Sequence, residues 1–396
     1  MKMPLCLSPV LFWLFLAAGL LAPLPPSMAQ QSTGAPDAKG LAGIRAAMEA
    51  EIAAHHAAGT VTLVLHDGQL VHHEAVGSAD REKGVAMTKD AVFWIASMTK
   101  SISVTAILTL ADEGRLSLDE PASNYLPSLK NVKLANGAAP QRPITLRDLM
   151  SHTAGIAFPP RKATDGAHSL ASYTEELVKA PLAFEPGSAY EYGFGITVAG
   201  RIAEIVSGQP FDAFVQERIL DPLGMKDTSF HPDDRLRARF VKTYKTAEDG
   251  KGLALAYNTF VTPEAAIRRM TEPSGGLFST ASDLAKFYQM ILNDGLHDGQ
   301  RIVSRAAIAE MTKGHSAGGK PVPYGLGWQT GTPGKPGIAG FSPRAFGHGG
   351  AFGTHGWIDP ERRVVTVYLV SNVLVKDGGQ ARDAFLSRVA GTAKAP

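Results

Sequence analysis

The hydrophobic pattern near the N-terminal end of the chain predicts a helix followed by a hairpin. Helical spacing runs over residues 41–58, and apolar residues then alternate over 61–65, which predicts a strand. Asp67-Gly68 separates this strand from a second strand-like run over 69–76. An Asp-Gly pair between two such runs is a strong signal for a hairpin.

The pattern then becomes helical, and strand signals return only near the C-terminal end. A long apolar helical stretch begins at Ser97 and ends near Gly114, which fits a C-terminal stop. The clearest later elements are helices over 199–206 and 211–219, strands over 324–330, 347–358 and 364–370 with a turn at 359–362, and a final helix over 377–389.

Strands at both ends of the chain with helices between them predict a discontinuous α/β domain that carries a helical insertion. We place the α/β domain over 41–114 and 271–396, and the helical domain over 115–270. The preceding segment, 30–40, consists mainly of small and polar residues and contains proline, so we expect a flexible leader there.

Composition and charge narrow the class of protein. The chain has 396 residues, of which 44% are hydrophobic and 19% charged, so a largely disordered chain or a fibre is excluded. Lys and Arg total 39 against 37 Asp and Glu, a formal charge of +2. We therefore expect neither a nucleic acid nor an anionic membrane surface as partner. No protein partner is indicated.

The first thirty residues are typical of an export signal. Lys2 precedes an apolar run over 11–22, and Ser27 and Ala29 supply small residues for cleavage, so we expect a signal peptide over 1–29 and a periplasmic or secreted protein. The alternative, a membrane anchor, needs about 20 apolar residues, and prolines interrupt this run. A lipid anchor on Cys6 has too few residues before it. Cleavage would remove Cys6, the only cysteine.

Ser97 and Lys100 carry the sharpest chemical signal. Residues three apart share one helix face, so the amine can reach the hydroxyl. Apolar residues lie on both sides, over 93–95 and 102–110, which places Lys100 toward the interior. A lysine acts as a base only when neutral, and lowering its pKa from about 10.4 to about 7–8 costs roughly 4 kcal/mol, a shift that desolvation can supply. The alternative is an ordinary N-cap serine beside a solvated lysine.

The segment 93–100, Phe-Trp-Ile-Ala-Ser-Met-Thr-Lys, resembles the nucleophile segment of the serine β-lactamase and penicillin-binding-protein superfamily. Within it the chain is most similar to the class C β-lactamase-like branch, which includes family VIII carboxylesterases. Further segments agree in order and spacing; these are 113–121, 149–155, Pro186-Gly187 ahead of 190–192, 221–225, and 275–283. The resemblance implies an antiparallel sheet flanked by helices with a helical insertion domain.

The same resemblance implies the roles of individual residues. Ser97 would be the nucleophile, and Tyr192, in the Tyr-Gly-Phe match to the second family motif, would share proton transfer with Lys100. The third motif matches His348-Gly349-Gly350 followed by Ala351. The backbone amides of Ser97 and Ala351 would then form an oxyanion hole.

Two positions depart from the β-lactamase pattern and bear on the substrate. Phe194 replaces an asparagine that helps to hold the substrate amide, and His348-Gly349 replaces a Lys-Thr pair that binds a carboxylate. Phe194, His348, Gly349 and Gly350 are the candidate substrate-binding residues. The less polar pocket favours an ester over a β-lactam or a peptide, although His348 could still donate a hydrogen bond and Arg344 could supply a cation.

Competing chemical signals are weak. Gly314-His-Ser-Ala-Gly318 matches the Gly-x-Ser-x-Gly nucleophile elbow, but neither the flanking pattern nor the order of the acid and histidine fits an α/β-hydrolase. None of the 12 histidines forms a His-Glu-x-x-His motif, so we expect no metal and no organic cofactor. His152 is interpreted as a structural hydrogen-bonding residue.

The sequence therefore predicts an exported serine hydrolase that acts through an acyl-enzyme on small carboxylic esters. The alternatives within the superfamily are a β-lactamase and a D-Ala-D-Ala carboxypeptidase. The alternative of another class is a catalytically inactive penicillin-binding-like binding module.

Overall fold

The computed structural model describes residues 36, 38–157, 169–256, 270–373 and 375–391. The predicted signal peptide over 1–29 lies outside the described residues. Of the predicted leader, residues 38–40 are already part of the first helix, α1 (Ala38–Ala42). None of the helices in the described ranges is both long enough and apolar enough to cross a membrane.

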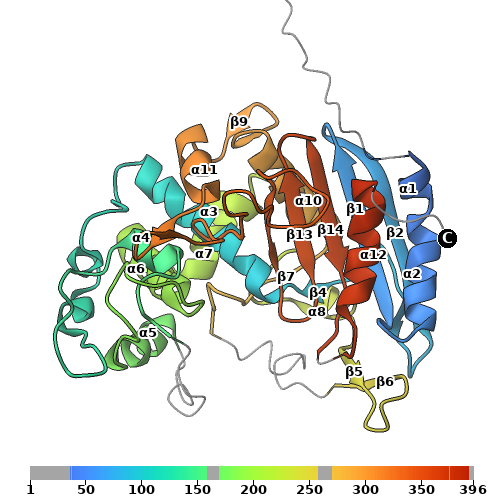
Figure 1. Cartoon of the computed structure of the whole chain (residues 1–396), viewed down its shortest axis with the longest axis horizontal. Coiled ribbons are helices and arrows are strands. Elements are labelled where there is room, and N and C mark those ends of the chain that lie inside the picture. The colour runs from blue at the N-terminus through green and yellow to red at the C-terminus, as the bar shows by residue number, and fades with distance from the viewer. Residues whose placement is uncertain (1–35, 37, 158–168, 257–269, 374, 392–396) are drawn as a thin grey trace, which may run out of the picture. The chain divides into compact units, whose positions relative to one another are not determined.

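A six-stranded antiparallel sheet joins the two ends of the chain (Figure 1). In spatial order its strands are β12 (Phe346–Gly349), β13 (His355–Asp359), β14 (Val364–Leu369), β1 (Gly59–His66), β2 (Gln69–Asp80) and β3 (Val85–Ala86). The N-terminal and C-terminal parts meet where β1 pairs with β14, with Val61 opposite Leu369. The antiparallel sheet and flanking helices confirm the predicted fold class.

The two hairpin turns lie where the sequence placed them, but one predicted strand is divided. Asp67 and Gly68 form the turn between β1 and β2, both with positive φ, and Asp359 pairs with Val364 across the β13–β14 turn. The single strand predicted over 347–358 is wrong: residues 350–354 form a turn, stabilised by the Gly350 amide donating to Thr354 O, between β12 and β13.

Helices cover both faces of the sheet. On one face, even-numbered residues of β14 such as Val364 and Tyr368 pack against α2 (Ile44–Ala53) and α12 (Gly379–Ala390). On the other face, odd-numbered residues such as Val365 and Val367 join a cluster that includes Leu284 and Phe287 of α10 (Ala281–Leu292). Because both faces are buried, β14 is apolar at nearly every position.

The helical region packs on this second face through α3 (Thr99–Asp112), of which residues 99–110 are all buried. Its other helices are α4 (Leu146–Met150), α5 (Leu170–Lys179), α6 (Gly195–Ser207) and α7 (Phe211–Val215), which continues as the π-helical turn η5 (Gln216–Leu220). One hydrophobic cluster runs from β1 through α3 to α6, so the helices share their core with the sheet.

The remaining elements are short, apart from α11. The structure contains η1 (Ala96–Met98), η2 (Ala122–Asn124), η3 (Pro127–Asn131), α8 (Asp234–Arg237), α11 (Arg305–Thr312), and the strands β4 (Phe93–Trp94), β5 (Tyr244–Thr246), β6 (Leu253–Leu255), β7 (Phe278–Ser279), β8 (Leu296–His297), β9 (Gln300–Arg301), β10 (Ser316–Ala317) and β11 (Lys320–Pro321).

The strand predicted over 324–330 is wrong. This segment folds back on itself, with only single bridges between Tyr324 and Gln329 and between Gln329 and Gly347. Gly327 has φ of +74°, and a Cβ there would lie 2.7 Å from the Val104 side chain. Because Gly327 packs so closely against α3, the segment 324–330 bends there, although its sequence pattern is that of a strand.

Candidate active site

Ser97 lies in a short 3₁₀ turn that connects β4 to α3. The turn begins at Ala96, which has φ of +46°, a conformation that non-glycine residues seldom adopt. Ser97 does not cap α3, because the N-cap position belongs to Met98 and no side chain caps the helix. Ser97 is partly exposed, whereas the residues on both sides of it are buried.

Lys100 is buried directly behind Ser97, with 3% of its surface exposed. Its Nζ donates to Ser97 Oγ at 3.2 Å and to the carbonyl oxygen of Ser274 at 2.7 Å. Burial lowers the pKa of Lys100 to about 8, and the charge of Glu272 opposes this shift. The amine is thus held beside the hydroxyl and can release its proton near neutral pH.

Tyr192 approaches the same hydroxyl from the segment that precedes α6. Its side chain is hydrogen-bonded to Ser97, and the Lys100 Nζ lies 4.7 Å from the centre of the Tyr192 ring. Burial raises the pKa of Tyr192 to about 12, against the lowering effect of the hydrogen bond to Ser97. The structure therefore brings together the three side chains that the sequence analysis assigned to proton transfer and nucleophilic attack, and Tyr192 stays protonated where Lys100 does not.

The segment 272–275 fixes the position of Lys100, and the sequence analysis did not single it out as part of the site. Three successive carbonyl oxygens of this segment accept hydrogen bonds from side chains around the nucleophile. Ser103 Oγ donates to Pro273 O at 2.8 Å, Lys100 Nζ donates to Ser274 O, and Trp94 Nε1 donates to Gly275 O at 2.6 Å. The only local signal was the Pro and Gly content, which indicates a turn but gives no partner.

The end of β12 lies against the nucleophile turn. A Cβ on Gly350 would lie 2.4 Å from Ile95 O and 2.1 Å from Thr354 Oγ1, so only glycine fits between these atoms. Thr354 Oγ1 also donates to Ile95 O at 3.3 Å. Ala351 follows directly and is exposed. The use of the Ser97 and Ala351 amides as an oxyanion hole remains a prediction.

His348 is buried, and both of its ring nitrogens have partners within the protein. Nδ1 donates to Gly349 O at 2.7 Å, and Nε2 accepts from the Tyr324 hydroxyl at 2.9 Å. Burial and the nearby charge of Lys100 lower the pKa of His348 to about 3, so the ring is neutral. His348 therefore supplies no cation, and its role in binding substrate remains a prediction.

The other departure from the β-lactamase pattern, Phe194, occupies the N-cap position of α6, and its side chain makes no capping hydrogen bond. Its ring is partly buried and meets the Tyr173 ring edge-on, with 6.0 Å between centres. Arg344, considered as a source of positive charge, lines a separate hollow of about 390 Å³ together with Arg305 and Lys313. Ser97 does not line this hollow, so Arg344 is not placed beside the nucleophile.

His152 holds the segment that carries Tyr192. It is buried, its Nδ1 accepts from the Gly193 amide at 3.2 Å, and its ring centre lies 4.4 Å from that of Tyr192. Burial lowers its pKa well below 6.5. These contacts agree with the structural role inferred from the sequence.

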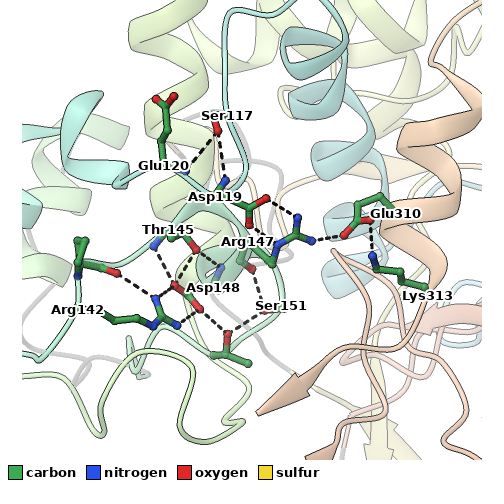
Figure 2. A network of polar contacts seen from close by, with 12 residues as sticks. Ser117, Asp119, Glu120, Arg142, Thr145, Arg147, Asp148, Ser151, Glu310 and Lys313 are labelled. Atoms are coloured by element: carbon green, nitrogen blue, oxygen red, sulfur yellow. Dashed lines mark hydrogen bonds and ion pairs between the residues drawn. The ribbon is translucent and has the colours of Figure 1, made fainter. Parts of the chain in front are cut away.

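A polar network anchors the chain just before His152 (Figure 2). Asp148 is buried and accepts from Thr145 N at 2.9 Å, from Thr145 Oγ1 at 2.8 Å, and from both terminal nitrogens of Arg142 at 2.7 and 2.8 Å. Thr145 and Asp148 form a capping box that starts α4. Arg147 points the other way in Figure 2, toward Asp119 and Glu310.

Ser316, the serine of the elbow-like motif, lies in the small β10–β11 hairpin and is exposed. A nucleophile elbow needs a strand followed by a helix, so this arrangement does not form one. Within the described ranges, no group of three or more His, Cys, Asp or Glu side chains is placed to hold a metal ion.

A family model and several known proteins are similar to this chain. A family model described as Beta-lactamase matches residues 44–390. The chain is 28% identical over 357 residues to esterase EstB of Burkholderia gladioli, covering 79% of this chain and 86% of EstB. It is 29% identical over 344 residues to a putative D-alanyl-D-alanine carboxypeptidase of Escherichia coli K12, covering 78% and 77%. The crystal structure of a family VIII carboxylesterase superposes with a TM-score of 0.72 at 22% identity, covering 90% of this chain and 98% of that chain, which shows a shared fold.

Proposed function

Because the chain belongs to the beta-lactamase family of serine hydrolases, we propose that it hydrolyses carboxylic esters through an acyl-enzyme formed on Ser97. The observation that carries the proposal is the hydrogen bond from the buried Lys100 amine to the hydroxyl of Ser97, a partly exposed residue. A neutral amine at this position can accept the proton of Ser97.

In the acylation step, the proton of the Ser97 hydroxyl moves to Lys100 Nζ while Oγ forms a bond to the ester carbonyl carbon. The carbonyl oxygen becomes an oxyanion, which the amides of Ser97 and Ala351 would stabilise. The bond to the alcohol oxygen then breaks. Tyr192 donates its proton to the departing alcohol and takes one from the Lys100 ammonium.

Deacylation repeats the sequence with water as the nucleophile. Lys100, neutral again, accepts a proton from water through Tyr192, and the water oxygen bonds to the acyl carbon. Collapse of the second tetrahedral intermediate breaks the bond to Ser97 Oγ. The acid leaves, and Ser97 regains its proton.

The proposed substrate preference rests on two positions, His348 and Phe194. His348 is neutral and fully engaged by Tyr324 and Gly349, so it offers no charge for a substrate carboxylate. Phe194 brings an aromatic ring in place of an amide group. Each missing hydrogen-bond partner costs about 1–3 kcal/mol in a closed site, so β-lactams and D-Ala-D-Ala peptides should bind and react poorly. Short-chain esters need neither contact, and the esterase name of a curated relative supports them.

We also propose that the protein is exported. The support is the sequence pattern alone: Lys2, the apolar run over 11–22 and the small residues Ser27 and Ala29. N-terminal sequencing of the protein recovered from periplasm and medium would test this, and recovery of the full-length chain from the cytoplasm alone would contradict it.

The reaction is tested by comparing kcat/KM for a butyrate ester and for a chromogenic cephalosporin. We expect the ester to exceed the cephalosporin by several orders of magnitude. Ser97→Ala should abolish ester hydrolysis and the fluorophosphonate label, while the matched control Ser316→Ala, at an exposed serine in a hairpin, should keep both.

Three results would contradict the proposal. A larger kcat/KM for the cephalosporin would indicate a β-lactamase, and release of D-alanine from a D-Ala-D-Ala peptide at the ester rate would indicate a carboxypeptidase. Absence of any covalent label on Ser97 would favour the inactive binding module.

A further inference from the structure

Glu272 links α6, which follows Tyr192, to the segment that holds Lys100, although no motif in the sequence pointed to it. One of its carboxylate oxygens accepts from Thr197 Oγ1 and from the Ser274 amide, the latter at 3.1 Å. Thr197 belongs to the first turn of α6, five residues after Tyr192. Ser274 is the residue whose carbonyl oxygen accepts from Lys100.

The contacts of Ser274 make this connection rigid. Its hydroxyl is hydrogen-bonded to Thr197 Oγ1 at 2.7 Å, and its side chain is buried. The carbonyls of the flanking residues, Pro273 and Gly275, are held by Ser103 and Trp94. The Glu272 carboxylate and the Lys100 amine therefore bind the same residue, at the amide and at the carbonyl of Ser274.

The electrostatic surroundings leave Glu272 as the one negative group that acts on Lys100 in the described part of the chain. Two tyrosines also interact with Glu272, Tyr192 before α6 and Tyr173 of α5. Glu272 raises the pKa of each phenol, after the larger effect of burial. The other titratable groups that interact with Lys100 are the imidazoles of His152 and His348, and burial keeps both neutral.

We propose that Glu272 is a positioning residue that supplies the counter-charge for the ammonium formed on Lys100 when Ser97 gives up its proton. This inference rests on the proposed function, in which Lys100 is the base. Proton transfer from Ser97 creates a buried positive charge, and a fixed carboxylate stabilises that charge as it develops. The same carboxylate keeps Lys100 from becoming too weak a base.

The test separates the charge of Glu272 from its hydrogen bonds. Glu272→Gln keeps an acceptor oxygen for Thr197 and Ser274 but removes the charge. Wild-type kcat/KM should rise with pH through the pKa of Lys100, about 8. Without the opposing carboxylate the pKa of Lys100 falls, so the amine is neutral at lower pH and the rising limb should move down by about one pH unit. The plateau should drop about threefold to tenfold, because the amine is a weaker base.

Two further variants distinguish charge from structure. Glu272→Asp restores the negative charge and should return the limb most of the way to its wild-type position. Thr197→Val removes the bridge to α6 but leaves the charge, so the plateau should fall while the limb stays in place. If Glu272→Gln leaves the limb unmoved, or Thr197→Val moves it as far, Glu272 is only a structural acceptor and the inference is wrong.

A second measurement keeps this result apart from the proposed function itself. The rate at which a fluorophosphonate labels Ser97, measured against pH, reports on the same proton transfer and does not depend on the ester chosen. If wild-type labelling shows no limb near the pKa of Lys100, the role of Lys100 as base fails. If the limb is present in the wild type and unchanged in Glu272→Gln, only the role of Glu272 fails.

Discussion

Lys100 shows how one residue can be both buried and reactive. Its amine is removed from water, yet it keeps two hydrogen-bond partners, Ser97 Oγ and Ser274 O. Desolvation lowers the pKa of Lys100 to about 8 while that of Tyr192 rises to about 12. Between these two pKa values Lys100 is mainly neutral and can act as a base, while Tyr192 is protonated and can donate a proton.

At this scale, removing the Tyr192 hydroxyl should impair proton transfer without disturbing the fold. Tyr192→Phe and Lys100→Ala should each lower the single-turnover acylation rate at least about a hundredfold, the usual scale of general acid–base catalysis. Tyr190→Phe is the matched control, because Tyr190 is a half-buried tyrosine whose pKa is likewise raised to about 12, with no hydrogen bond to Ser97 in the described contacts. Near-normal acylation in both Tyr192→Phe and Lys100→Ala would contradict these roles.

Among the elements, α4 is linked to the active site through His152, although it contributes no reacting group. Its capping box fixes residues 145–148, and the chain then passes through Ser151 and Thr153, whose hydroxyls extend the network of Asp148. His152 lies between them with φ of +60° and holds Gly193. A short helix thereby sets the position of Tyr192 through one histidine.

We expect Asp148→Asn to lower the free energy of unfolding by about 2–4 kcal/mol, because it removes a buried carboxylate that satisfies a helix cap and the Arg142 fork. Asp119→Asn is the control, since Asp119 also pairs with an arginine in Figure 2 but its side chain is 70% exposed. That variant should lose less than about 1 kcal/mol. Equal losses in urea unfolding would show that burial of Asp148 is not what matters.

For the whole molecule, buried neutral histidines should make the fold sensitive to acid. Burial lowers the pKa of His348 to about 3, and those of His152 and His355 well below 6.5. In the unfolded chain each imidazole gains a proton as pH falls below about 6.5, but in the folded chain it does not. The unfolded state then binds more protons, so stability is lost as pH falls from about 6.5 toward the folded pKa.

Each such histidine removes at most about 1.4 kcal/mol of stability per pH unit in this range. We therefore expect the free energy of unfolding, measured in urea, to fall by several kcal/mol between about pH 6.5 and 5. His355→Asn should remove the contribution of one histidine to this slope, which is at most about 1.4 kcal/mol per pH unit. A stability that stays flat over the same range would contradict the neutral, buried state of these rings.

The sequence by itself determined the features that depend on neighbours along the chain. The hairpin at Asp67-Gly68 and the course of α3 follow from turn chemistry and helical spacing over a few residues. Ser97 and Lys100 are three residues apart, so one turn of backbone is enough to bring the amine to the hydroxyl. The placement of Tyr192 was reached through resemblance rather than through any local signal.

Only the tertiary structure decided the features that depend on contacts between distant segments. Gly327 bends an apparent strand because Val104 of α3 leaves no room, and the strand predicted over 347–358 is interrupted at a turn where Gly350 packs against Ile95. His348 is neutral because burial, and after it the charge of Lys100, lowers its pKa. Glu272 is linked to Lys100 through Ser274, which lies more than 170 residues further along the chain. Local pattern encodes which face of an element is buried, but not which partner covers it, and the partner sets both the backbone bend and the charge state.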